Sequence, residues 1–161
     1  MPKFLAPVSL NEALHSSLLE NFDCGDETIN DWLKKKALAN EFNGGSRTYV
    51  VLTSEGDLAG FFCLASHSVS HRDLKAAFKR NMPNPVPTIL LGRMGVAVKY
   101  QRSGLGKSML SQCVRIARSA KAQIGTKALI VHPISAAAAK FYCRHGFQEA
   151  KARLPMLYYP L

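Results

Sequence analysis

Hydrophobic positions along the first half of the chain change from helical to strand spacing. From about Thr28 the apolar residues recur every three or four positions, and Gly44 and Gly45 follow as a stop, which predicts a helix. Residues 47–53 and 58–65 are instead rich in β-branched and aromatic side chains, with a turn at 55–57. That pattern predicts two strands joined as a hairpin.

The N-terminal segment predicts a short strand over Phe4–Val8 followed by a helix. Ser9 has the side chain of a helix N-cap, and Glu12 three residues later would complete a capping box. The helix is expected to end near residues 21–23.

The second half continues the mixed order. Residues 71–80 are compatible with a helix or a loop, and Pro83, Pro85 and Pro87 then favour an extended connection. The apolar run 88–98 predicts a strand buried on both faces. The elements expected after it are a glycine-rich loop, a helix over 104–123, a strand over 127–132, a helix over 136–144 capped by Ser135, and a strand over 153–160. The fold class is therefore α/β, in one domain covering residues 1–161.

Composition adds exclusions to this picture. Apolar residues make up 47 % of the 161, and no apolar run is long enough to cross a bilayer, so we expect a soluble, cytoplasmic protein. The cysteines, Cys24, Cys63, Cys113 and Cys143, lie far apart without a Cys-x-x-Cys pair. That spacing favours neither a disulfide nor a metal site.

Charge is distributed unevenly along the chain. Residues 1–33 carry one basic and six acidic side chains, whereas the remainder carries twenty basic and five acidic ones. Residues 74–148 contain thirteen Lys or Arg and no Asp or Glu. Such a stretch favours a polyanionic partner, with nucleic acid first, although a basic surface that serves only solubility is the alternative.

The loop Gln101–Lys107 has the features of an anion cradle. Its glycines let backbone N–H groups approach an anion, the following helix adds partial positive charge, and Arg102 and Lys107 add whole charges. Gly106-Lys107-Ser108 matches the end of a nucleotide-binding P-loop, but the opening glycine is missing and no acidic metal ligand lies nearby. A dinucleotide loop would need a glycine where Met109 stands.

Gln-Arg-Ser-Gly-Leu-Gly after Gly-Val-Ala-Val at 95–98 resembles the acyl-CoA signature of the GNAT acetyltransferases. The segment Ser135 to Phe147 resembles the second signature of that superfamily, with Ser135 in place of the usual Asn. The resemblance implies a mixed central sheet splayed open into a V and flanked by helices, with acetyl-CoA as cosubstrate and no metal. It also implies that the cosubstrate contacts Val96, Ala97, Val98, Arg102, Ser103, Gly104, Leu105, Gly106, Lys107 and Ser108.

The same resemblance places Tyr142 at the position that donates a proton to the departing CoA thiolate. A packed aromatic side chain is the alternative role. No convincing general base appears, and His132 and His145 are the remaining candidates. A missing base favours an α-amine acceptor, with an ordinary pKa of about 7.7–8.0, over a lysine amine at about 10.4.

Within the superfamily, the chain resembles the GNAT-fold toxins of bacterial type II toxin–antitoxin systems. The resemblance covers segments 22–25, 29–33, 45–50, 80–87 and 91–94, of which the proline-rich linker and Leu-Gly-Arg are the most specific. It implies acetylation of the α-amine of aminoacyl-tRNA, which blocks translation. A homodimer and a ribbon-helix-helix antitoxin are the implied partners.

Candidate tRNA contacts are Arg93, Lys35, Lys36, Lys79 and Arg80. Arg93 stands out because an arginine inside an apolar strand is costly unless it is paired or faces a site. Two other functions stay open, namely acetylation of a small amine or a protein, and non-enzymatic nucleic-acid binding on the same fold.

Overall fold

The computed structural model describes residues 2–10, 16–150 and 155–161. The chain forms two compact units, and each unit combines two separate segments. The first consists of Met1–Ala65 and Arg93–Cys113, and the second of Ser66–Gly92 and Val114–Leu161. Among the described residues the strand order is β1-β2-β3-β4-β5-β7-β6, a mixed seven-stranded sheet, so the α/β fold class is confirmed.

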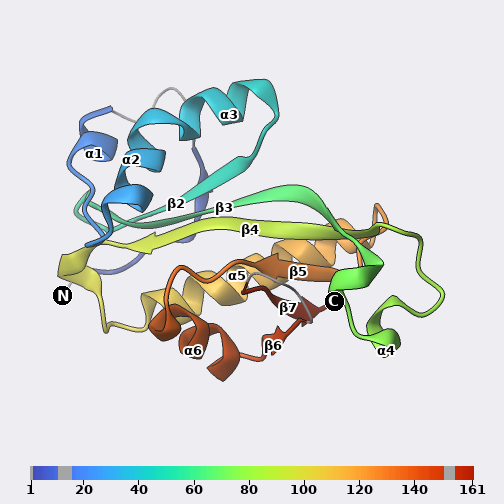
Figure 1. The fold of residues 1–161 in the computed structure, drawn as a ribbon. Helices are drawn as coiled ribbons and strands as arrows, with labels where there is room; N and C mark the ends of the chain where they lie inside the picture. The colour runs from blue at the N-terminus through green and yellow to red at the C-terminus, as the bar shows by residue number, and fades with distance from the viewer. Residues whose placement is uncertain (1, 11–15, 151–154) are drawn as a thin grey trace. The chain divides into compact units, whose positions relative to one another are not determined.

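The first unit places three short helices on one face of a β-meander (Figure 1). Strand β2 pairs antiparallel with both β1 and β3, and its Val50 faces Val8 on one side and Phe61 on the other. Its complete elements are β1 (Val8–Ser9), α1 (Ser16–Glu20), α2 (Glu27–Lys35), α3 (Ala37–Asn43) and β2 (Arg47–Leu52). It also contains parts of β3 (Leu58–Val69), β4 (Val86–Val96) and α5 (Leu105–Lys121), and the 3-10 turn η2 (Val98–Tyr100).

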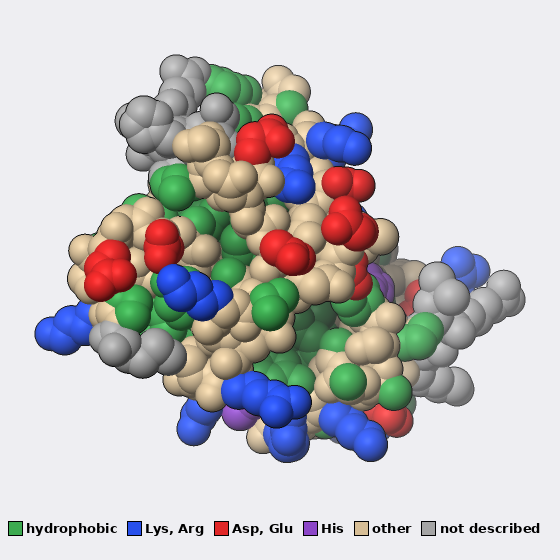
Figure 2. Space-filling view, turned by 90° about the vertical axis from the view of Figure 1, so that its left-hand side faces the viewer, with side chains coloured by type: hydrophobic (Ala, Val, Ile, Leu, Met, Phe, Trp, Pro, Cys, Tyr) green, Lys and Arg blue, Asp and Glu red, His purple; other side chains and the backbone are tan. Residues whose placement is uncertain are grey.

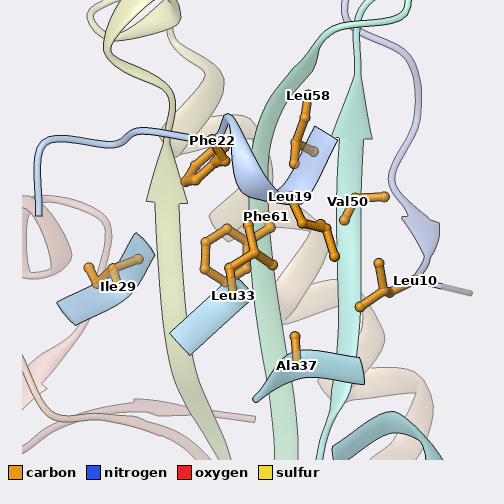
Figure 3. Close-up of a cluster of buried hydrophobic side chains, with 9 residues drawn as sticks. All are labelled: Leu10, Leu19, Phe22, Ile29, Leu33, Ala37, Val50, Leu58 and Phe61. Atoms are coloured by element: carbon orange, nitrogen blue, oxygen red, sulfur yellow. The ribbon is translucent and has the colours of Figure 1, made fainter. Parts of the chain in front are cut away.

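The core of this unit lies between the helices and the strands. Leu33 and Ala37 point from the helices towards Phe61 of β3, and all three side chains are almost completely buried (Figure 3). Burial of one such large apolar side chain contributes about 1.5–3 kcal/mol. The apolar residues that recur at helical spacing in the sequence are therefore those on the core-facing side of the helices.

The N-terminal prediction is wrong in part. Ser9 lies in β1, paired with Tyr49, so it does not cap a helix, and Glu12 lies outside the described residues. Strand β1 includes Val8 but not Phe4, which forms an isolated bridge with Thr53. The predicted end of the helix is confirmed, because α1 ends at Glu20.

The predicted helix over residues 28–43 is two helices. Asp26 caps α2, and its carboxylate accepts hydrogen bonds from the N–H groups of Thr28 and Ile29 at 2.9 and 3.1 Å. Lys36, with φ −120° and ψ −31°, separates α2 from α3, and α3 ends at Asn43, followed by Gly44 with φ +78°.

The second unit is built on a parallel pair of strands. Leu90 of β4 lies beside Ile130 of β5, and β7 runs antiparallel to β5. Its elements are η1 (His71–Asp73), α4 (Ala76–Lys79), β5 (Ala128–Val131), α6 (Ala136–Arg144), β6 (Gln148–Glu149) and β7 (Leu157–Pro160), with the remaining parts of β3, β4 and α5. Segment 71–80 is therefore a 3-10 turn and one short helix.

The apolar run around residues 88–98 does form strand β4, but the predicted burial on both faces is wrong. Val86, Thr88 and Leu91 are buried, whereas Arg93 is exposed. No helix among the described residues is long and apolar enough to span a bilayer.

Candidate active site

A sharp turn joins the end of β4 to helix α5. The side-chain amide of Gln101 donates hydrogen bonds to the carbonyl oxygens of Cys24 at 2.8 Å and Val96 at 2.9 Å. Ser103 Oγ donates to the carbonyl oxygen of Tyr100 at 2.5 Å. Arg102 and Gly104 both adopt positive φ, at +60° and +86°. A left-handed arginine is uncommon and is held only where its surroundings require that geometry.

This turn leaves backbone donors available at the start of α5. Within the described part of the chain, the N–H groups from Arg102 to Lys107 donate none of the backbone hydrogen bonds found in turns, loops and caps. The next N–H, that of Ser108, bonds to Gly104 O at 3.1 Å. Arg102 and Lys107 have exposed side chains. Free N–H groups at a helix start, together with two cations, suit a pyrophosphate.

The backbone of Val96, Ala97 and Val98, predicted to bind pantetheine, already makes hydrogen bonds within the protein. Ala97 N–H donates to Ala59 O at 2.8 Å, and Val98 N–H donates to Asp23 O at 2.9 Å. A pantetheine contact at either N–H would replace one of these bonds. The carbonyl oxygens keep a second lone pair, so we expect cosubstrate contacts from this segment at those oxygens.

The segment Asp23–Gly25 contacts the glycine turn, because its backbone accepts hydrogen bonds from Val98 and Gln101. The side chain of Asn30, 2 % exposed, accepts a hydrogen bond from Cys24 N–H at 2.9 Å and donates one to Asp23 Oδ1 at 3.0 Å. Gly25 N–H also donates to Asp23 Oδ1, at 2.8 Å. Hydrogen bonds from Gly25 and then Asn30 lower the pKa of the Asp23 carboxyl. Sequence reasoning missed Asn30, and the available signal was a polar residue on the apolar face of a helix.

A pocket of about 390 Å³ adjoins the end of β4, and sequence reasoning did not identify it. Phe22, Leu58 and Val98 are among its lining residues. At its rim, Tyr100 donates a hydrogen bond to Asp57 Oδ2 at 2.8 Å, and this bond is the main cause of the raised Tyr100 pKa.

Tyr142 lies in the second unit, on helix α6. Ser135 caps this helix as predicted, since its hydroxyl accepts a hydrogen bond from Ala138 N–H at 3.0 Å. The Tyr142 ring is buried, with ring centroids 5.3 Å from those of both Phe141 and Phe147. This packing fixes the direction of the ring, while its role as proton donor stays a prediction.

The candidate bases have different surroundings. His132 is exposed after β5, and its Nδ1 lies 3.4 Å from Pro155 O. His145 packs edge-on against Phe141, with ring centroids 4.9 Å apart. Sequence analysis did not single out His67, because the predicted strand ended at residue 65. Its ring centroid is 6.0 Å from that of His132, and burial, followed by the charge of His132, lowers its pKa.

Basic residues predicted to contact tRNA differ in what they touch. Lys35 forms an ion pair with Asp31 at 3.8 Å, and Lys79 Nζ donates to His71 O at 3.0 Å. The guanidinium carbon of Arg93 lies 5.7 Å from the ring centroid of Trp32. Lys36 and Arg80 are exposed. Figure 2 shows one face that carries both acidic and basic side chains, with several of the basic ones along its lower edge.

Residues 45–149 match the sequence profile described as an acetyltransferase (GNAT) domain, and the matched range includes both the glycine loop and Tyr142. The chain therefore belongs to the GNAT acetyltransferase family and is an N-acetyltransferase. It is 38 % identical, over 92 % of its length and 87 % of the relative's, to the tRNA-acetylating toxin of Mycobacterium tuberculosis (strain ATCC 25618 / H37Rv).

Solved structures share the fold at lower identity. AtaT complexed with acetyl-methionyl-tRNAfMet superposes with a TM-score of 0.88 at 22 % identity, covering 98 % of this chain and 95 % of that one. A tyrosine-to-phenylalanine mutant of AtaT, bound to the C-terminus of the antitoxin AtaR and acetyl-CoA, gives a TM-score of 0.82 at 22 % identity, covering 98 % and 93 %. At this identity the likeness establishes the fold.

Proposed function

We propose that this enzyme transfers acetyl from acetyl-CoA to the α-amine of the amino acid on charged tRNA, and thereby blocks translation in the cytoplasm. The observation that carries the proposal is the set of backbone donors at the start of α5, combined with 38 % identity to a tRNA-acetylating toxin. The acid-free basic stretch of residues 74–148 supports a nucleic-acid substrate independently.

The residues of the glycine turn have separate tasks in this proposal. The N–H groups from Arg102 to Lys107 and the two cationic side chains bind the pyrophosphate, and Gln101 holds the turn against Cys24 and Val96. Bound acetyl-CoA supplies an activated acetyl group, whose carbonyl carbon the neutral amine attacks. Because the turn is already shaped before binding, little conformational entropy is lost when the cosubstrate arrives.

We assign the proton for the departing sulfur to Tyr142. When the carbon–sulfur bond breaks, its electron pair stays on sulfur as a thiolate, and the phenol hydroxyl donates its proton there. The attacking amine, now carrying the acetyl group, releases one proton to water or to a base. Packing of the ring between Phe141 and Phe147 holds the hydroxyl in one direction, as a general acid requires.

The choice of an α-amine follows from the small demand that it places on a base. A free α-amine is substantially neutral near pH 7.7–8.0. Burial, followed by the charge of His132, lowers the pKa of His67 and so keeps the His67 imidazole neutral in the same range.

For partners, we propose a homodimer neutralised by a ribbon-helix-helix antitoxin. The antitoxin part of this proposal is supported by the AtaT complex with the C-terminus of AtaR, whereas the dimer and the antitoxin class rest on the sequence resemblance. We also propose that residues 1–161 act as one domain.

The experiment that tests the function uses labelled acetyl-CoA with charged and uncharged tRNA. We expect label on charged tRNA alone, and we expect Tyr142→Phe to lower kcat by about 10²–10⁴-fold with unchanged acetyl-CoA affinity. Tyr49→Phe is the matched control, because this half-buried tyrosine stacks on Phe62 and lies far from the glycine turn along the chain. Label on a small amine or a protein, with none on charged tRNA, would refute the proposed acceptor.

A further inference from the structure

The pocket of about 390 Å³ beside the end of β4 has no task in the proposed reaction. All of its lining residues belong to the first unit. Phe22 and Leu58 form a buried part of the lining, whereas Val98 is 53 % exposed. Small-molecule sites have volumes of about 300–1,000 Å³ and mostly apolar walls. An occupant with an apolar body would remove the Val98 side chain from water.

Charged residues make the rest of the lining acidic. Asp23 and Asp57 line the pocket together with one cation, Lys99, so two carboxylates and one ammonium leave a net charge of −1. The Lys99 ammonium lies 3.7 Å from Asp57 Oδ2, but its side chain is 72 % exposed, so solvent weakens this pair. Hydrogen bonds from Gly25 and then Asn30 lower the pKa of Asp23, which keeps that carboxyl ionised at neutral pH.

Each carboxylate has one oxygen that can accept from a ligand. Among the described residues, Gly25 N–H and the Asn30 amide both donate to Asp23 Oδ1. The Tyr100 hydroxyl donates to Asp57 Oδ2. Because a carboxylate accepts at both of its oxygens, Asp23 Oδ2 and Asp57 Oδ1 can bind the N–H groups of a cation.

The pocket also shares residues with the glycine turn and its support. The carbonyl oxygen of Asp23 accepts from Val98 N–H at 2.9 Å, and that of Tyr100 accepts from the Ser103 hydroxyl at 2.5 Å. Ser103 is part of the turn itself. An occupant that holds Asp23 and Tyr100 in place therefore restricts the turn in the shape that suits a pyrophosphate.

We propose that this pocket binds a small organic cation, an ammonium or guanidinium attached to an apolar body, and that its occupation strengthens acetyl-CoA binding at the glycine turn. The apolar body packs against Phe22, Leu58 and Val98, and the cation pairs with the two carboxylates. Coupling between two sites is reciprocal, so acetyl-CoA strengthens binding of the cation by the same factor. The site requires neither tRNA nor an acetyl acceptor, so it does not depend on the proposed function.

Phenylbutylamine tests the class of ligand, with phenylbutanol and phenylbutyrate as controls of nearly the same shape. We expect a dissociation constant in the millimolar range for the amine, about fivefold weaker binding of the neutral alcohol, and no detectable binding of the anion. In methyl NMR spectra the Leu58 and Val98 signals should shift saturably. Ile124, which is exposed but outside the lining, controls for non-specific contact and should not shift.

Three substitutions test the charges. Asp57→Asn keeps an acceptor for Tyr100 but removes the negative charge, so amine binding should weaken about threefold while alcohol binding stays unchanged. Glu55→Gln is the matched control, because Glu55 is an exposed carboxylate of the same β2–β3 connection that lies outside the lining, and it should change amine binding by less than about 1.5-fold. Lys99→Met removes the competing cation and should tighten amine binding about twofold.

Calorimetry of acetyl-CoA binding, with and without saturating phenylbutylamine, tests the coupling. We expect about fivefold tighter binding of acetyl-CoA in the presence of the amine. An acetyl-CoA affinity that is unchanged or lower would overturn the coupling.

The cation site itself is overturned by equal affinities for the amine and the alcohol, or by equal weakening in Asp57→Asn and Glu55→Gln. Constant Leu58 and Val98 methyl signals would place the amine elsewhere and overturn it as well. If Asp57→Asn does not fold, the exposed Lys99→Met variant, compared with the unsubstituted protein for the amine and the alcohol, still decides the matter.

Discussion

Replacing Asn30 with leucine removes the support of the glycine turn while keeping nearly the same side-chain volume. Two hydrogen bonds are lost, from Cys24 N–H at 2.9 Å and to Asp23 Oδ1 at 3.0 Å. Each contributes about 0.5–1.5 kcal/mol, and leaving the Cys24 N–H without an acceptor costs about 1–3 kcal/mol. The expected loss in free energy of unfolding is about 2–4 kcal/mol.

That loss should leave a folded protein, because domains of this size are stable by about 5–15 kcal/mol. At about 2–4 °C per kcal/mol, Tm should fall by roughly 5–15 °C in a thermal melt. Acetyl-CoA affinity, measured by calorimetry below Tm, should fall too, because the Asp23 and Cys24 carbonyl oxygens that accept from Val98 and Gln101 lose their fixed position.

Two further variants separate the causes. Asn43→Leu changes an exposed asparagine at the end of α3, and we expect its stability to change by no more than about 0.5 kcal/mol. Asn30→Asp keeps an acceptor for Cys24 N–H but places a second carboxylate beside Asp23, so its defect should shrink as pH falls and the carboxylates protonate. A Tm within 1 °C of wild type (roughly 0.5 kcal/mol) and unchanged acetyl-CoA affinity in Asn30→Leu would refute the reasoning.

Gly104→Ala should weaken acetyl-CoA binding several-fold, measured by calorimetry, because φ +86° costs a residue with a side chain about 1–2 kcal/mol. Gly125→Ala is the control and should leave the affinity unchanged, because an added methyl group there also meets open space and the φ is not positive. Ser135→Ala removes the α6 cap and should cost about 1 kcal/mol, seen as a Tm lower by about 2–4 °C, and an unchanged Tm would contradict the capping role. The value of kcat/KM should rise about tenfold per pH unit up to about pH 7.7–8.0, because a protonated α-amine is not a nucleophile. If the whole rise in kcat/KM occurred below pH 6.5, it would instead indicate titration of His67. The Asp23 pKa is lowered on folding, so its stabilising contribution is present above the unfolded pKa and should be lost as pH falls through the folded one, which an acid titration of stability followed in Asp23→Asn would check.

Local signals in the sequence predicted the parts of the molecule that local physics determines. The glycine turn, helix α5 and the Ser135 cap all follow from residues within one or two turns of each other, and the structure has each of them. The same kind of signal failed at Ser9, because pairing with Tyr49, forty residues away in the chain, outweighed its capping propensity.

What the sequence did not predict depends on contacts between distant segments. Gln101 reaches Cys24 across 77 positions, so nothing near the glycine turn indicated the role of Asn30. His67 was missed because β3 continues to Val69, beyond the apolar run that marked the strand. The two signatures themselves were found, because each is a short continuous segment.

Each compact unit is made of two pieces of chain, and this arrangement constrains how the protein is synthesised and divided. The path passes between the units after Ala65, after Gly92 and after Cys113. The first unit therefore lacks residues 93–113, including the glycine turn, until residues 66–92 have been synthesised, and the second needs residues 114–161, which follow both. No single cut separates one unit cleanly from the other, because a fragment that ends at Cys113 still carries Ser66–Gly92 of the second unit. A truncated chain is therefore expected to carry part of an incomplete unit.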